Sequence, residues 1–146
     1  MKQLPILVLS LLISSKAFMQ TKTYSYLALG DSYTIGESVP MSKNFPHQTV
    51  TLLKKAGVNM NEPAIVAKTG WTTDELQEQL SLTRLAVPFD FVTLLIGVNN
   101  QYRGRSADEY SKQFEELLQQ AIDYADGKTN HVIVLSIPDW GVTPFA

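Results

Sequence analysis

The sequence predicts an α/β fold in which a mostly parallel sheet is covered by helices on both faces. Short apolar runs rich in β-branched and aromatic residues alternate along the chain with segments whose apolar residues keep helical spacing. The most apolar run, FDFVTLLIG, lacks polar alternation, which is typical of a strand buried on both faces. Strands that alternate with helices pack as parallel neighbours, and 146 residues suit one such domain.

Four apolar, β-prone runs are predicted to form the strands of this sheet. Each is bounded by glycine, proline or polar residues that favour turns. The predicted strands are residues 24–29, 62–70, 89–97 and 131–138. The first of them ends directly at Gly30, where the chain must turn.

Two of the intervening segments carry clear signals for a helix. Residues 44–56 have Pro46 in the first turn, an apolar stripe at helical spacing, and Gly57 as a stop. The segment TTDELQEQL opens with Thr72 and Glu75 at the spacing of a capping box, which predicts a helix over 72–80.

A third and longer helix is predicted before the last strand. Ser106 and Glu109 form another capping-box pair, and apolar residues then keep helical spacing for about four turns, as far as Ala125. Gly127 ends this helix.

The first twenty residues have the layout of a secretory signal peptide rather than of a domain element. A basic residue precedes an apolar stretch over 4–13, and Ser15 and Ala17 follow at the spacing that a signal peptidase prefers. We therefore expect residues 1–20 to be a leader and 21–146 to be the domain. A buried N-terminal strand is the alternative interpretation of the same segment.

The leader predicts that the protein is secreted or periplasmic. Its apolar stretch is too short to span a bilayer comfortably, so we expect no stable membrane span. No cysteine follows the stretch, which argues against a lipoprotein anchor.

Composition excludes several classes of function. The net charge is −2 and no basic patch with interleaved aromatic residues occurs, which argues against a nucleic-acid partner. The sequence has no cysteine and only two histidines, so it predicts neither a disulfide framework nor a typical zinc site. Oligomeric state is left open by these features.

Glycine-containing turns follow three of the predicted strands. They are Gly30-Asp31-Ser32, Thr69-Gly70 and Gly97-Val98-Asn99-Asn100. Because ligands gather at the carboxyl ends of strands in open α/β sheets, these turns are predicted to share one edge. Ser32 could act as a nucleophile there, with the N–H groups of Ser32 and Gly70 and the amide of Asn99 as donors to an oxyanion. Each turn taken alone would be an ordinary loop.

The three turns together resemble the motifs of the SGNH (GDSL-like) hydrolases, which are lipases and esterases. GDSYT is similar to the first block, KTGWTTDEL to the second, GVNN to the third, and IPDWGVTPF to the segment after the fourth strand of secreted bacterial members. The resemblance implies a flavodoxin-like three-layer α/β/α fold and hydrolysis of an acylated sugar, a lipid or a small acyl ester without a cofactor. It implies Ser32 as nucleophile, and Gly70 and Asn99 as oxyanion donors.

Two features depart from that family pattern. The third block usually ends in aspartate, where this chain has Asn100, which puts the support of that loop in question. The Asp-x-x-His block that supplies the general base does not occur in the sequence. We therefore expect the chain to be the N-terminal part of a hydrolase domain, with little activity alone and an unpaired apolar edge on its fourth strand.

Four other titratable residues are candidates for the general base or for the carboxylate that orients it. His131 is predicted at the amino end of its strand, opposite the site, and His47 follows the Ser32 loop with nothing that clearly orients it. Asp31 is expected to structure its loop and point away from Ser32. Asp139 follows the fourth strand at the right edge but has no histidine beside it.

Two other classes of function stay open at this point. One is a non-catalytic ligand-binding module on the same scaffold. The other is a flavodoxin-like or nucleotide-binding domain, which the absence of Gly-x-Gly-x-x-Gly spacing and of a Walker lysine disfavours. Trp71, Tyr102 and Trp140 are predicted near the rim of the site, where they could either stack on a substrate or pack.

Overall fold

A four-stranded parallel sheet forms the centre of the molecule, as the computed structural model shows for residues 22–142. The strand order is β2-β1-β3-β4, and every neighbouring pair is parallel. The strands are β1 (Tyr26–Gly30), β2 (Ala64–Ala67), β3 (Phe91–Leu95) and β4 (Val132–Val134). The predicted α/β class is confirmed. The expected leader over residues 1–20 lies outside the described residues.

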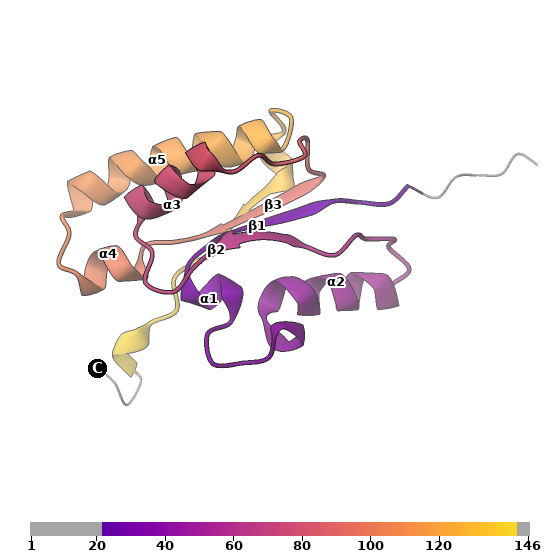
Figure 1. Ribbon diagram of the computed structural model, residues 1–146, viewed down its shortest axis with the longest axis horizontal. Coiled ribbons are helices and arrows are strands. Elements are labelled where there is room, and N and C mark those ends of the chain that lie inside the picture. The colour runs from indigo at the N-terminus through magenta and orange to yellow at the C-terminus, as the bar shows by residue number, and fades with distance from the viewer. Residues whose placement is uncertain (1–21, 143–146) are drawn as a thin grey trace, which may run out of the picture.

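Helices cover both faces of this sheet, which gives the three layers that the resemblance implied. Figure 1 shows α3 and α5 on one face and α1 and α2 on the other. The helices are α1 (Ser32–Ile35), α2 (Phe45–Lys55), α3 (Thr73–Leu82), α4 (Val98–Tyr102) and α5 (Ala107–Tyr124), with short 3₁₀ turns η1 (Met41–Lys43), η2 (Thr129–His131) and η3 (Trp140–Val142). None of the helices over residues 22–142 is both long and apolar enough to cross a membrane.

Side-chain hydrogen bonds cap the three long helices; the caps at Thr72 and Ser106 were predicted, and the one at Asn44 was not. Asn44 Oδ1 accepts a 3.0 Å hydrogen bond from His47 N at the start of α2, and Ser106 Oγ accepts one of 3.1 Å from Glu109 N at the start of α5. Thr72 N donates a 2.8 Å bond to the Glu75 carboxylate before α3. These bonds satisfy first-turn N–H groups that have no partner within the helix.

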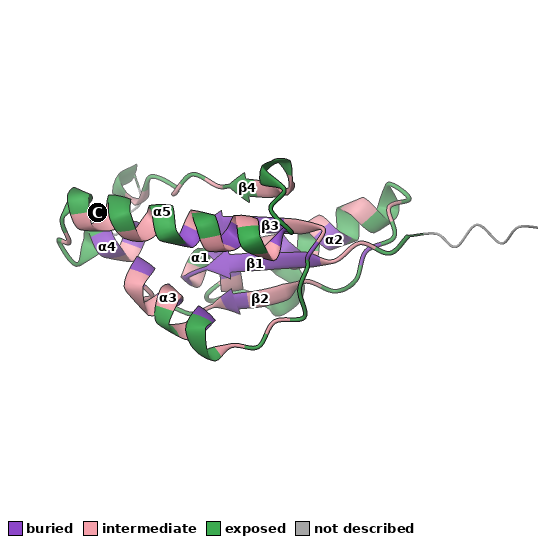
Figure 2. Cartoon of the chain, turned by 90° about the horizontal axis from the view of Figure 1, so that it is seen from above, coloured by how far each residue is buried: buried purple, intermediate pink, exposed green. Residues whose placement is uncertain are grey.

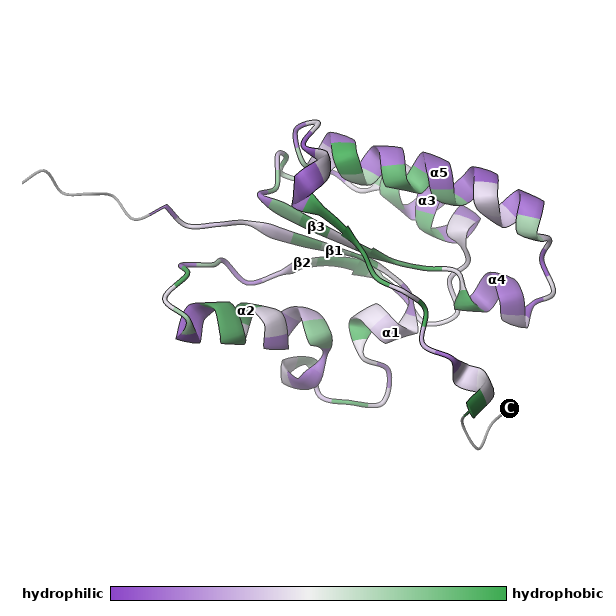
Figure 3. Ribbon diagram, turned by 180° about the vertical axis from the view of Figure 1, so that it is seen from behind, coloured by the Kyte–Doolittle hydropathy of each residue, from purple (hydrophilic) through white to green (hydrophobic). Residues whose placement is uncertain are grey.

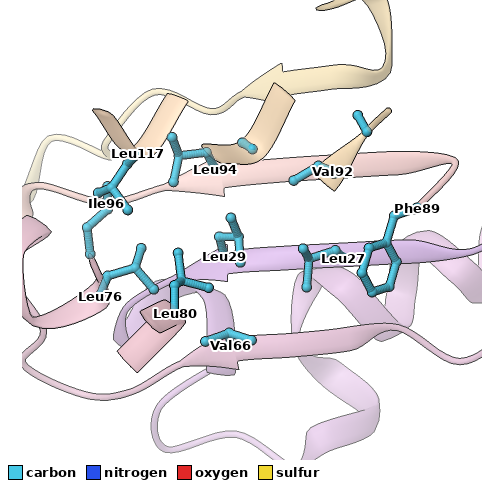
Figure 4. Packing of buried hydrophobic residues seen from close by; sticks show 12 residues of the cluster. Leu27, Leu29, Val66, Leu76, Leu80, Phe89, Val92, Leu94, Ile96 and Leu117 are labelled. Atoms are coloured by element: carbon cyan, nitrogen blue, oxygen red, sulfur yellow. The ribbon is translucent and has the colours of Figure 1, made fainter. Parts of the chain in front are cut away.

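The main hydrophobic core lies between the sheet and the α3–α5 layer. Figure 4 shows leucines of β1 and β3 pointing toward those of α3 and α5. The buried cluster consists of Leu27, Leu29, Val66, Leu76, Leu80, Phe89, Val92, Leu94, Ile96, Leu117, Ala121 and Ala125. A smaller cluster of Tyr26, Ala28, Val50 and Met60 lies under α2. Because β1 contributes to both clusters, its sequence is apolar without alternation.

The fourth strand is shorter than predicted, and within residues 22–142 one of its edges is unpaired, as expected. It spans three residues rather than eight, and only one further ladder bond follows, from Leu135 N to Leu94 O at 3.0 Å. Within the described chain β4 pairs with β3 alone, and Ile133 and Val134 are about half exposed, at 50% and 48%. Figure 2 shows this contrast between β4 and the fully buried β1. A strand with one free side and little cover is easily shortened.

An apolar groove of about 910 Å³ lies beside α2, on the face of β3 and β4 that no described helix covers. Phe91 and Thr93 of β3 line it together with Ile133 and Leu135 from the β4 segment. Seen from behind in Figure 3, the apolar strand that leads to the C-terminus crosses between α5 and α2 with no helix over it. The groove contains none of the predicted site residues.

Candidate active site

The register of the sheet brings the three predicted turns to one edge. Gly30, the last residue of β1, pairs with Ala67 of β2 on one side and Leu95 of β3 on the other. Ser32 then follows two residues after Gly30, Gly70 three after Ala67, and Asn99 four after Leu95. Since β1 lies between the other two strands, the Ser32 turn lies between the Gly70 and Asn99 turns. Figure 1 shows α1 and α4 at this end of the sheet.

Ser32 is the first residue of α1 and is half-buried. Its N–H group belongs to the first helical turn and makes no backbone hydrogen bond in the described chain. Its hydroxyl is not hydrogen-bonded to any side chain of residues 22–142. Both groups are therefore available to a molecule at this edge.

Gly30 and Asp31 hold the Ser32 turn in place. A Cβ on Gly30 would lie 2.1 Å from Thr34 Oγ1 and 2.3 Å from the Leu95 carbonyl oxygen, so only glycine fits where α1 meets β3. Asp31 is the N-cap of α1, and its Oδ1 accepts a 3.0 Å bond from Tyr33 N, in keeping with the expected loop-structuring role. Burial raises the pKa of Asp31 to about 6, and its Oδ2 has no partner in the described chain.

Gly70 lies in a tight turn between β2 and α3. Trp71 N donates a 3.2 Å bond to Lys68 O, and Gly70 has a φ of +84°. Thr69 is not among the residues with positive φ, so this is a type II turn, which requires glycine at this position. The Gly70 N–H makes no backbone hydrogen bond within residues 22–142, while the Gly70 carbonyl accepts a 2.6 Å bond from Arg103 Nη2.

Asn99 joins the second and third turns directly. It lies in α4, whose N-cap Gly97 has a φ of +129°, and its Nδ2 donates a 2.9 Å bond to the Trp71 carbonyl oxygen. A side-chain amide has two N–H donors, so one remains for a ligand. The bond fixes the direction of the amide before any substrate arrives.

Asn100 stands where the family pattern usually has aspartate, and its side chain supports the loop after β3. Its side chain is 2% exposed; Oδ1 accepts from Thr73 N at 3.1 Å, and Nδ2 donates to Thr73 Oγ1 at 2.7 Å. The Thr73 hydroxyl then donates to Gln113 Oε1 of α5. The amide therefore ties α4 to the start of α3 with both of its polar atoms satisfied.

Both histidines of the sequence lie in the described chain, and neither is hydrogen-bonded to Ser32. His47 Nδ1 is 2.8 Å from Asn44 Oδ1, so the expectation that nothing orients its ring was wrong. His131 precedes β4 at its amino end, as predicted, and stacks on Phe91 with ring centroids 5.6 Å apart. Asp139 Oδ1 accepts a 2.9 Å bond from Gly141 N.

The three aromatic residues predicted near the rim have different environments. Trp71 packs against the main hydrophobic core and is half-buried. Tyr102 is 75% exposed and meets Trp140 edge-on, with ring centroids 6.1 Å apart. Trp140 Nε1 donates a 3.4 Å bond to Gln101 Oε1, which connects η3 to α4.

Two residues that contact the site were not predicted from the sequence to do so. Arg103 holds the Gly70 carbonyl, and Glu37 accepts a hydrogen bond from Thr69 Oγ1, which joins the Ser32 and Gly70 turns. Each partner is more than thirty residues away along the chain, so no local spacing indicates either contact.

Comparison with known proteins gives one family match over most of this chain. A family model described as "GDSL-like Lipase/Acylhydrolase family" matches residues 28–146. No curated protein matches the chain.

Several solved structures share the fold. AlinE4, described as an SGNH-hydrolase family esterase, is 19% identical with a TM-score of 0.67, and the match covers 80% of this chain and 60% of AlinE4. TesA is 18% identical with a TM-score of 0.68, covering 85% of this chain and 66% of TesA. The psychrotrophic esterase EstA from Pseudoalteromonas sp. is 13% identical with a TM-score of 0.65, covering 82% and 64%. The chain thus spans 60–66% of the length of these three structures.

Proposed function

Because the chain belongs to the GDSL-like lipase/acylhydrolase family, we propose that it carries the nucleophile and the oxyanion donors of a serine ester hydrolase. The observation that carries this proposal is the register of the sheet, which brings Ser32, Gly70 and Asn99 to neighbouring turns at one edge. The bond from Asn99 to the Trp71 carbonyl supports it, because it fixes two of the donors relative to each other.

In the proposed reaction, Ser32 Oγ attacks the carbonyl carbon of the ester while a general base takes the hydroxyl proton. The N–H groups of Ser32 and Gly70 and the free N–H of the Asn99 amide then hold the negative oxygen of the tetrahedral intermediate. The alcohol leaves with the proton returned by the base. Water attacks the acyl-Ser32 ester, and the acid is released.

The general base is the part that the described chain does not supply at Ser32. We assign it to a histidine in a further segment of the complete protein, after residue 146. The apolar groove beside α2 supports this assignment, because β3 and β4 would be buried by a helix packed there. The coverage of the solved structures also supports the assignment, because the chain spans only 60–66% of their length. On this account the 146-residue chain alone turns over esters weakly or not at all.

The second candidate function is a ligand-binding module on the same scaffold, without turnover. One observation favours it: neither His47 nor His131 is hydrogen-bonded to Ser32, and both have other partners, Asn44 and Phe91. A complete protein that binds acyl compounds but does not hydrolyse them would support this candidate over the esterase.

The substrate class is proposed to be an acylated sugar, a lipid or a small acyl ester. The exposed Tyr102 and its partner Trp140 offer aromatic surface on α4 and η3, next to the Asn99 turn. Aromatic faces suit both sugar rings and acyl chains, so they do not separate these substrates.

Export is proposed from the leader pattern over residues 1–20. Amino-terminal sequencing of the protein recovered from the periplasm or culture medium tests it. Cleavage after one of residues 17–20 is expected, which gives a mature chain that starts at one of residues 18–21; an intact Met1 on protein that stays inside the cell would contradict it.

The esterase proposal is tested by comparing two serine variants of the complete protein on short-chain aryl esters. Ser32→Ala should lower kcat by about 10⁶-fold, leaving only the slow attack of water that the oxyanion donors still assist. Ser42→Ala is the matched control, because Ser42 is exposed in η1, away from the three turns. If Ser32→Ala keeps wild-type hydrolysis, Ser32 is not the nucleophile.

A further inference from the structure

Side chains of α4 and its C-cap hydrogen-bond to two successive carbonyl groups, those of Gly70 and Trp71. These carbonyls belong to the loop between β2 and α3, which carries the Gly70 N–H. Asn99 Nδ2 donates to Trp71 O at 2.9 Å, and Arg103 Nη2 donates to Gly70 O at 2.6 Å. Asn99 lies within α4 and Arg103 is its C-cap residue; they are four residues apart, so they lie on the same side of the helix axis. The loop is therefore held at two neighbouring points by one rigid element.

The other terminal nitrogen of the Arg103 guanidinium contacts the start of α3. Arg103 Nη1 donates to Glu75 Oε1 at 3.2 Å, while Glu75 Oε2 accepts from Thr72 N at 2.8 Å. Arg103 thus spans the turn, with the Gly70 carbonyl on one side and the capping carboxylate of α3 on the other. A planar guanidinium suits this double contact, because its donors lie in a fixed geometry.

The turn needs such support because its hydrogen bonding is sparse. Its one backbone bond runs from Trp71 N to Lys68 O at 3.2 Å, and Gly70 is free to leave a φ of +84° since it has no side chain. In a type I turn the peptide between the two central residues is flipped relative to type II. That peptide, Thr69–Gly70, carries the Gly70 N–H, and Gly70 joins it to the Gly70–Trp71 peptide whose carbonyl Arg103 holds. Movement of the held peptide would therefore change the direction of this donor.

We propose that Arg103 is a positioning residue for ester hydrolysis: it fixes the Gly70–Trp71 peptide against α4 and so keeps the Gly70 N–H aimed beside the Asn99 amide. This rests on the proposed function, in which both groups hold the oxyanion. Arg103 itself touches no reacting atom. Its ion pair with Glu75 is exposed, with side-chain exposures of 41% and 36%, so its loss should hardly change overall stability.

Arg105 is a matched control for Arg103. It also connects the α4 region to α3, with Nη2 3.3 Å from Asp74 Oδ2, and it bonds Glu109 at 2.7 Å. It makes no contact with the Gly70 carbonyl. A general effect of removing an arginine or an ion pair beside α3 would therefore appear in both variants.

The first measurement is amide hydrogen exchange by NMR on the complete protein, and its result does not depend on catalysis. Arg103→Ala should raise the exchange rate of the Trp71 N–H at least about tenfold, because opening of the turn exposes it. Arg105→Ala should leave that rate unchanged. Equal rates in wild type and Arg103→Ala would overturn the proposal.

The second measurement is steady-state kinetics on the complete protein. Arg103→Ala should lower kcat about tenfold or more, up to the 10²–10³ that loss of one oxyanion donor costs, with KM within about twofold. Arg103→Lys should recover part of kcat, because an ammonium can still reach the Gly70 carbonyl. An unchanged kcat, or an equal loss in Arg105→Ala, would overturn the positioning role.

The Ser32→Ala variant separates this proposal from the esterase assignment. If Ser32→Ala keeps its hydrolysis, the proposed function fails, and the positioning role in that reaction fails with it, whatever the exchange data show. If Ser32→Ala is inactive but Arg103→Ala keeps the wild-type kcat and exchange rate, only the role of Arg103 is lost.

Discussion

The side-chain amide of Asn99 donates a 2.9 Å hydrogen bond to the carbonyl oxygen of Trp71. The bond joins the turn after β3 to the turn after β2, twenty-eight residues earlier in the sequence. A donor that is already oriented needs no reorganisation when negative charge develops on a substrate oxygen.

Asn99→Ala should slow ester hydrolysis by the complete protein about 10²–10³-fold, as expected for removing one oxyanion donor. The fold should persist, because only one partly buried hydrogen bond is lost, worth about 1 kcal/mol. Steady-state kinetics and thermal unfolding check the two effects separately. Asn130→Ala, at an exposed position before β4, serves as the control. A loss smaller than about threefold would remove Asn99 from the mechanism.

Asn100→Asp should destabilise the protein, although aspartate is the usual residue at this position in the family. The Thr73 hydroxyl now accepts from Asn100 Nδ2 and donates to Gln113; a carboxylate cannot donate, so one acceptor would lose its partner. The expected cost at pH 7 is about 1–3 kcal/mol in the free energy of unfolding, measured by urea denaturation. Equal stabilities of wild type and Asn100→Asp at pH 7 would show that the network around Thr73 adapts without cost.

Asp31 should make the protein less stable at neutral than at acidic pH. Burial raises the pKa of Asp31 to about 6 in the folded state, above its ordinary value of 3.8, so the folded state holds the proton more tightly. Below about pH 4, Asp31 does not change the free energy of unfolding. As pH rises from about 4 to about 6, ionisation of Asp31 lowers this free energy, and above pH 6 the reduction is constant at about 3 kcal/mol.

Asp31→Asn isolates this effect, because asparagine caps a helix as well as aspartate. Urea unfolding from pH 4 to pH 8 should show equal free energies of unfolding for the variant and the wild type near pH 4. As pH rises to 6 and above, the variant should become the more stable of the two. Parallel pH profiles for the two proteins would mean that Asp31 does not titrate in this range.

The groove beside α2 should make the chain of residues 21–146 associate with itself when expressed alone. Ile133 lines the groove and is 50% exposed, on a strand with a free side. Ile133→Lys should shift the population toward monomer in size-exclusion chromatography with light scattering. Leu82→Lys, at a 73% exposed position on α3, is the control and should behave as wild type. A wild-type monomer with a sharp, reversible melt would contradict this prediction.

The sequence predicts the layers of this fold well because its signals are local. The apolar run around β3, the cap at Ser106 and the strand-end glycines each depend on neighbouring residues, and the structure has the expected elements there. Helices α1 and α4 were missed because four or five residues are too few for helical periodicity. β4 was predicted too long, since an apolar run does not show where pairing ends.

The predicted site residues come together because parallel strands end at a common edge, which element order alone implies. The contacts that orient them could not be predicted. The bonds from Arg103 to Gly70 and from Asn100 to Thr73 join residues about thirty positions apart, and they depend on how α4 docks against the loop before α3. The Asn44–His47 contact is local, and asparagine at a helix N-cap three residues before a histidine is the signal that could have indicated it.

Labelling the complete protein with a fluorophosphonate, followed by peptide mass spectrometry, tests the central claim most directly. A reactive serine beside oxyanion donors should form one stable adduct, on the peptide that contains Ser32, and Ser32→Ala should abolish it while Ser42→Ala does not. Absence of labelling at Ser32 in a folded protein, or an adduct at another residue, would contradict the assignment of Ser32 as the nucleophile.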